Sequence, residues 1–110
     1  MRTAPRQMYY DRQGNPMTME RWAAAFEDDK IQRLLHEYVD PVGDVRVSTV
    51  WLGLDHRFVD EGEPLIFETM VFGGPHDQSQ WRWPTEEAAR AGHAEILKAL
   101  REGRDPKELP

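Results

Sequence analysis

The sequence predicts an α+β fold: an antiparallel meander of three to four strands with two helices packed on one face, plus a short N-terminal hairpin. Two apolar runs, 45–54 and 64–73, are rich in β-branched and aromatic residues and flank a polar loop, as neighbouring strands do. Apolar residues recur at helical spacing before and after them, in 18–26 and 85–100. The order hairpin, helix, strands, helix follows from these observations.

The first elements are short. Residues 8–17 predict a hairpin, because Asp11 and Gly14 are the residue types that a type I turn with a bulge needs. Thr18 is placed to cap the helix that follows, with its hydroxyl accepting an unpaired amide. Three acids at 27–29 oppose the dipole at the end of that helix, so we expect it to be short.

The segment 31–39 fits two structures. Leu34 and Leu35 suit a continuing helix, whereas Tyr38, Val39 and the turn at 40–44 favour a strand that runs into a hairpin. We predict a strand and leave the helix open as the alternative.

A fourth strand is predicted over 79–83, where Trp81 and Trp83 point to one face. Pro84 ends it and Thr85 caps the last helix. The inner face of that helix is a stripe of apolar residues that includes His93, which we expect to be a core or boundary histidine.

Composition limits the possible classes of protein. A chain of 110 residues predicts one domain, 1–100, followed by a charged and flexible tail, 101–110. With no cysteine, disulfides and thiolate metal sites are excluded. No apolar run approaches the length of about 20 residues that a membrane span needs, so we expect a cytoplasmic protein.

Acidic residues are concentrated in the middle of the chain. The net charge is −6, and residues 27–77 alone carry twelve acids and four bases. Nucleic-acid binding depends on Lys and Arg that neutralise phosphates, so direct binding to DNA or RNA is disfavoured. An acidic surface instead attracts a basic face of another protein.

The loop between the two strongest strands, 55–63, is the first candidate site. Asp55 and His56 of this loop, together with Glu68, are residues of the kind that bind a metal ion or act as acid and base in a hydrolase. Asp55 and His56 are adjacent, however, and adjacent residues of an extended segment point apart. A polar loop whose side chains bond nearby backbone is the favoured interpretation.

Glu68 lies in a strand with two largely apolar faces, so we expect partial burial and an ion pair with Arg46 or Arg57. A catalytic role is the alternative. Trp51, Trp81 and Trp83 are expected to pack in the core, with an interface hot spot as their second role. The binding candidates are Trp51, Asp55, His56, Arg57, Phe58, Asp60, Glu61, Glu63, Glu68, Trp81 and Trp83.

Three strings, 9–16, 46–58 and 65–73, resemble a family of small uncharacterised proteins common in actinobacteria and their tailed phages. The resemblance covers about 8–100 and departs in 31–44 and in the charged tail. It implies no activity. It implies a setting, namely a cytoplasmic accessory protein of phage origin that acts on a host or phage macromolecule.

The leading hypothesis is therefore a protein without a cofactor that binds another protein as a modulator or inhibitor. The alternative is a small metal-dependent or acid–base hydrolase that uses Asp55, His56 and Glu68. Nucleic-acid binding ranks third, because helix–strands–helix resembles the topology of double-stranded-RNA-binding domains but no lysine cluster opens the last helix.

Overall fold

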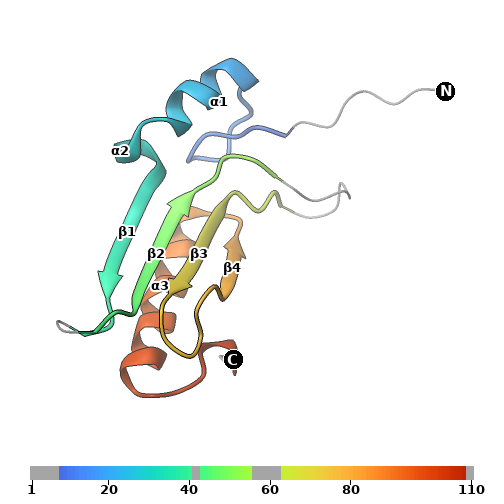
Figure 1. The fold of residues 1–110 in the computed structure, drawn as a ribbon. Helices are drawn as coiled ribbons and strands as arrows, with labels where there is room; N and C mark the ends of the chain where they lie inside the picture. Colours follow the sequence, from blue (N-terminus) through green and yellow to red (C-terminus); the bar gives the residue numbers. More distant parts are fainter. Residues whose placement is uncertain (1–7, 41–42, 56–62, 109–110) are drawn as a thin grey trace.

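Four antiparallel strands form one sheet in the order β1-β2-β3-β4, so the predicted α+β class and meander are confirmed (Figure 1). The computed structural model describes residues 8–40, 43–55 and 63–108. Its elements are α1 (Met19–Phe26), α2 (Asp29–Gln32), β1 (Arg33–Tyr38), β2 (Arg46–Trp51), β3 (Phe67–Phe72), β4 (Gln80–Trp83), α3 (Glu86–Arg101) and the 3-10 turn η1 (Pro106–Glu108).

One face of the sheet packs against α3, which runs behind it in Figure 1. Burial alternates strictly along β2 and β3, as it must when a strand has one covered face. Val47 and Val71 pack with Ile96 and Leu97 of the helix. Trp51 and Phe67 form a second cluster with Ala89. The apolar stripe of the last helix is thus the core-facing side predicted for it.

The first helix differs from the prediction in its position. Only α3 lies along the sheet face, whereas α1 lies at the end of the sheet (Figure 1). It is anchored there by Trp22, whose Nε1–H donates to the Leu52 carbonyl at 2.8 Å. The Phe26 ring lies 6.3 Å from that of Trp51. Because α1 has eight residues and none is buried, it closes one end of the core and does not form a layer.

The predicted N-terminal hairpin is present. Tyr10 bridges to Pro16, and the Asp11 carboxylate accepts from the backbone N–H groups of Gln13 and Asn15. Gly14 has a φ of +87°, which glycine adopts without strain. The hairpin docks on the chain after β2 through a bridge between Tyr9 and Leu54.

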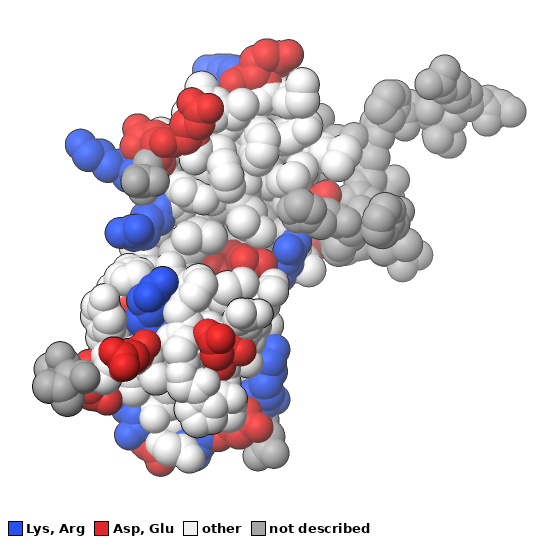
Figure 2. All heavy atoms as spheres, viewed as in Figure 1, with Lys and Arg blue, Asp and Glu red and all other residues white. Residues whose placement is uncertain are grey.

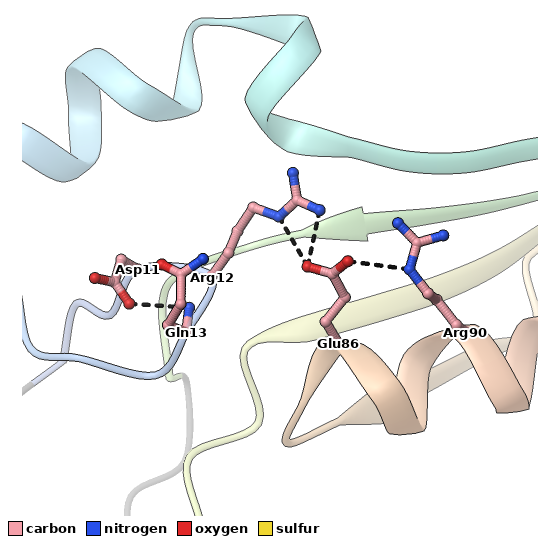
Figure 3. Close-up of polar contacts among 5 residues, drawn as sticks. All are labelled: Asp11, Arg12, Gln13, Glu86 and Arg90. Atoms are coloured by element: carbon pink, nitrogen blue, oxygen red, sulfur yellow. Dashed lines mark hydrogen bonds and ion pairs between the residues drawn. The ribbon is translucent and has the colours of Figure 1, made fainter.

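An ion pair also joins the hairpin to the first turn of α3. The guanidinium of Arg12 donates twice to one carboxylate oxygen of Glu86, and Arg90 donates to the other (Figure 3). Burial raises the pKa of Glu86, but the hydrogen bonds from Arg12 and Arg90 outweigh it and hold the pKa below its ordinary value. Glu86 therefore stays ionised at the helix end where the dipole favours negative charge.

The segment 31–39, which fits either a helix or a strand by sequence, contains the end of a short helix and a strand. Residues 29–32 form the short α2 because the carbonyl of Asp28 accepts from Ile31 and Gln32, and its carboxylate accepts from Lys30. The strand begins only at Arg33, with an irregular register between Arg33 and Leu35. The prediction of a strand from residue 31 was therefore wrong for its first two positions.

The chain beyond α3 turns back along the sheet. Pro106 is fully buried, and Lys107 Nζ donates to the Gln80 carbonyl of β4 at 2.9 Å. Arg101, the last residue of α3, donates to the carbonyls of Tyr38 and Val39 at the other edge. Within the described ranges, no helix combines the length and apolar character of a membrane span.

Candidate functional site: the uncovered face of the sheet

The face of the sheet that points away from α3 is the candidate site. No described element lies over it in Figure 1, and Figure 2 shows it as a largely uncharged surface with scattered charges. The strand register orders its side chains in three rows across the sheet. The rows are Arg33, Val50, Glu68 and Arg82; His36, Ser48, Met70 and Gln80; and Tyr38, Arg46 and Phe72. We call this surface the uncovered face.

The uncovered face is locally cationic although the chain is acidic. It carries Arg33, Arg46 and Arg82 against the single acid Glu68, whereas the whole chain has a net charge of −6. The pKa of His36 is lowered by burial and by the positive charges of Arg33 and Arg46, so the imidazole is neutral at pH 7. The rows themselves therefore favour negative charge on a partner, and Asp and Glu side chains lie around them in the same view (Figure 2).

Contacts within the uncovered face hold its side chains in place. The Arg46 guanidinium lies 4.5 Å above the centre of the Phe72 ring, a cation–π contact. The His36 and Tyr38 rings meet edge to face at 5.8 Å, and Tyr38 is 53% exposed. Ordered aromatic and arginine side chains lose little conformational entropy when a partner binds.

Glu68 forms the cross-strand ion pair expected for it, but with a different partner. Its carboxylate accepts from Arg82 Nε at 3.2 Å, and its side chain is 14% exposed. The predicted partners were Arg46 and Arg57. Register decides the pairing, because Arg82 of β4 lies directly opposite Glu68. Arg46 lies two rows away, and Arg57 is outside the described residues.

The other predicted binding residues are not gathered in one place. Trp51 is 1% exposed, and it belongs to the core under α3. Asp55 is 3% exposed, and its backbone N–H donates to the Met8 carbonyl. Glu63 is exposed at the start of the chain segment that leads to β3. The remaining loop candidates, His56, Arg57, Phe58, Asp60 and Glu61, lie outside the described residues.

Trp81 and Trp83 share one face, as predicted, and it is the face toward α3. Trp83 packs against core residues and donates its Nε1–H to Thr69 Oγ1 at 2.9 Å. Lys107 lies 4.3 Å above the Trp81 ring. Both tryptophans are therefore engaged within the molecule and only partly open to solvent.

A chain of hydrogen bonds, buried at its centre and part-buried at its ends, runs from Trp83 through Thr69, Thr49 and His93 to Glu37. Glu37, as a carboxylate, only accepts, so His93 Nε2–H donates to it. The other nitrogen of the neutral ring, Nδ1, then accepts from the Thr49 hydroxyl at 2.8 Å. Thr49 accepts from Thr69 at 2.6 Å, and Thr69 from the indole. The Thr49 and Thr69 hydroxyls and both nitrogens of the His93 ring thus have partners.

A hydroxyl, an imidazole and a carboxylate in this order also form the nucleophile triad of many hydrolases. Here the hydroxyl of Thr49 has no route to a substrate, because Thr49 is fully buried and His93 is 1% exposed. The arrangement is a satisfied polar network in the core. His93 is thus the core histidine that the sequence predicted.

This network predicts a pH-dependent stability. Burial lowers the pKa of His93 and outweighs the opposing effect of Glu37, while Arg90 and His36 lower the pKa further. The unfolded chain, with an ordinary pKa of about 6.5, therefore binds more protons as the pH falls below that value. We expect the free energy of unfolding to decrease on acidification by up to about 1.4 kcal/mol per pH unit until the folded pKa is reached.

Urea unfolding of the wild type and of His93→Asn between about pH 7.5 and pH 5 measures this effect. Asparagine keeps an acceptor for Thr49 but does not titrate, so the variant is expected to have a shallower slope. The pKa of His36 is also lowered, but His36 is present in both proteins, so its own titration contributes to both slopes. Equal slopes would contradict the assignment to His93.

Sequence reasoning missed the uncovered face. The available signal was the alternation of Arg46, Ser48 and Val50 with the fully buried positions of the same strand. This signal was obscured for two reasons. The excess of acids over bases in residues 27–77 suggested an acidic surface, and the sequence did not settle where the strand in 31–39 begins. Only the register places Arg33 and Arg82, far apart in sequence, in one row.

The described part of the chain contains no group of three or more His, Asp or Glu side chains arranged to hold a metal ion. Comparison with protein-family models, with curated proteins and with solved structures finds no match to this chain.

Proposed function

We propose that this chain is a cytoplasmic accessory protein that acts by binding another protein through the uncovered face. One observation carries the proposal: a four-stranded sheet has one face packed on α3 and leaves the other, with its arginine, aromatic and methionine side chains, open. These residue types are the ones enriched in the energetic centres of protein interfaces.

The proposal includes the role of a modulator or inhibitor in a phage or its actinobacterial host, the setting that the sequence resemblance implies. A binding role needs no assembled catalytic group. It does need an ordered surface, which the Arg46–Phe72 and His36–Tyr38 contacts supply.

The hydrolase hypothesis is not favoured by any observation. Asp55 is buried beside the N-terminal hairpin, while Glu68 lies on the uncovered face in an ion pair with Arg82. We therefore propose no reaction for this chain.

Ser48→Glu tests the proposed surface. Ser48 lies in the middle row between His36 and Met70, with Arg46 two positions away on the same strand, so a carboxylate there repels and obstructs a partner docked on the uncovered face. Immobilised wild type should capture a specific protein from actinobacterial extract, measured by quantitative mass spectrometry. Ser48→Glu should reduce that capture by about tenfold or more, as loss of a contact near an interface centre does.

Ala91→Glu is the matched control. It adds the same carboxylate to an exposed position of α3, on the other side of the sheet. Its capture should equal that of the wild type. If nothing is captured specifically, or if Ser48→Glu captures as much as Ala91→Glu, the proposed function is wrong.

A further inference from the structure

The edge of β1 carries backbone groups that point away from the sheet. β1 is the first strand in the sheet order and pairs only with β2. Val39 N–H donates to the Val45 carbonyl, which turns the backbone of Val39 toward β2. In an antiparallel pair, alternate residues face the partner strand, so Tyr38 and His36 present their backbone groups outward. At the end of the strand, Arg101 donates to the carbonyls of both Tyr38 and Val39, at 3.1 and 2.9 Å.

Arg101 occupies one end of this edge, and the middle is open. In the described residues, no hydrogen bond is recorded for the outward N–H and C=O of His36. An exposed edge of this kind accepts an additional strand from another chain.

Cations flank the open edge on both sides of the sheet. Arg33 of β1 lies on the uncovered face, whereas Arg46 lies one strand further in with its guanidinium over Phe72 of β3. On the other side, a groove of about 460 Å³ between β1 and α3 is lined by Lys98 and Arg101, and by Arg90, which is paired with Glu86.

Both acids of that groove accept hydrogen bonds, but only Glu102 has a cationic partner, since the His93 ring that bonds Glu37 is neutral. The Glu37 carboxylate accepts from His93 Nε2 at 3.1 Å, and Glu102 is paired with Arg104 at 2.6 Å. Lys98 is exposed and enters none of the ion pairs found in the described ranges. The surroundings of the edge therefore favour negative charge on an added strand.

We propose that the partner adds an extended acidic segment to the edge of β1 as a fifth strand, paired on the backbone of His36. This inference rests on the proposed protein-binding function and names the chemistry of the partner. Side chains of an added strand alternate between the two faces. Acidic side chains on one side meet Arg33, and those on the other meet Lys98 and Arg101.

A second copy of this chain fits the edge less well. Pairing of β1 with β1 about a two-fold axis brings the same arginines and lysine of both copies together. Like charges placed opposite each other across strands are destabilising. The charge pattern thus favours an acidic segment of a different protein.

His36→Pro tests the backbone pairing directly. Proline is accepted on an edge strand where the N–H faces outward, so it removes the donor offered to the partner and leaves the bonds to β2. His36→Ala is the matched control, because it removes the same side chain and keeps the N–H. The probe is a fluorescein-labelled octapeptide of alternating glutamate and valine, and its counterpart has lysine in place of glutamate.

The acidic peptide should bind the wild type by fluorescence anisotropy, and the lysine peptide should not. His36→Pro should bind about tenfold more weakly than His36→Ala, the expected effect of one lost backbone hydrogen bond. Circular dichroism and thermal melts establish that both variants are folded. Lys98→Glu, on the exposed surface of α3, should weaken binding of the acidic peptide without changing the strand.

Equal binding by folded His36→Pro and His36→Ala overturns strand addition, as does equal binding of the two peptides. Tighter binding of single-stranded DNA than of the acidic peptide, or a wild-type dimer in sedimentation, also overturns it. If the captured cellular partner is lost with Ser48→Glu but binds His36→Pro and His36→Ala alike, strand addition fails while the proposed function stands.

Discussion

Replacing Trp51 by alanine is expected to lower the free energy of unfolding by about 3–5 kcal/mol, the range for removing a large buried aromatic side chain. Trp51 is 1% exposed and packs with Ile66, Phe67 and Ala89. Its Nε1–H donates to the Tyr10 carbonyl at 3.1 Å, so the substitution also loosens the N-terminal hairpin. Because small domains are stable by only about 5–15 kcal/mol, urea unfolding should show a large shift of the midpoint.

Tyr38→Ala is the control for this prediction. Tyr38 is also aromatic but is 53% exposed on the uncovered face, so its removal should change stability by no more than about 0.5 kcal/mol. The two substitutions also separate packing from binding, since Trp51 was a candidate interface residue. If Trp51→Ala kept wild-type stability and lost partner capture, Trp51 would be a binding residue and the core described here would be wrong.

Gly92→Ala is expected to destabilise the protein by about 1–3 kcal/mol, the usual cost of overpacking. Helix propensity alone gives the opposite sign, since alanine is favoured over glycine inside a helix by about 1 kcal/mol. Gly92 lies in α3 directly against Trp83, and an added Cβ would stand 2.2 Å from the indole ring. The ring is held by its bond to Thr69, so moving it breaks the hydrogen-bond chain of the core.

Ala91→Gly is the control, at the neighbouring position with the same two residue types. Ala91 is exposed, so only propensity acts there, and the substitution should cost about 1 kcal/mol. Thermal or urea unfolding measures the free energy of unfolding of both variants and so separates the effect of packing on Trp83 from that of helix propensity. A stability gain in Gly92→Ala would show that Trp83 does not pack on the helix as described.

Most of the fold could be predicted because its signals are local. Thr18 and Thr85 cap their helices by accepting from residues three positions later, which spacing alone predicts. The alternation along 46–51 and 67–72 likewise follows from the chain itself. The position of α1 could not be predicted, because it depends on where Trp22 finds a carbonyl beyond the end of β2.

The candidate site was poorly predicted for a related reason. Trp51 attracted attention by its residue type, which does not reveal whether the ring faces α3 or solvent. His36 and Lys98 were not candidates, because what singles them out is that both lie near one edge of the sheet.

What the amino-acid order by itself determined is the class of fold, the caps of both longer helices and the face of each central strand that is buried. These properties arise from interactions between residues a few positions apart. Tertiary structure alone decided that Glu68 pairs with Arg82, that His93 bonds both Thr49 and Glu37, and that an acidic chain presents a cationic sheet face. Those outcomes depend on strand register, which joins residues distant in sequence and is set only when the core packs.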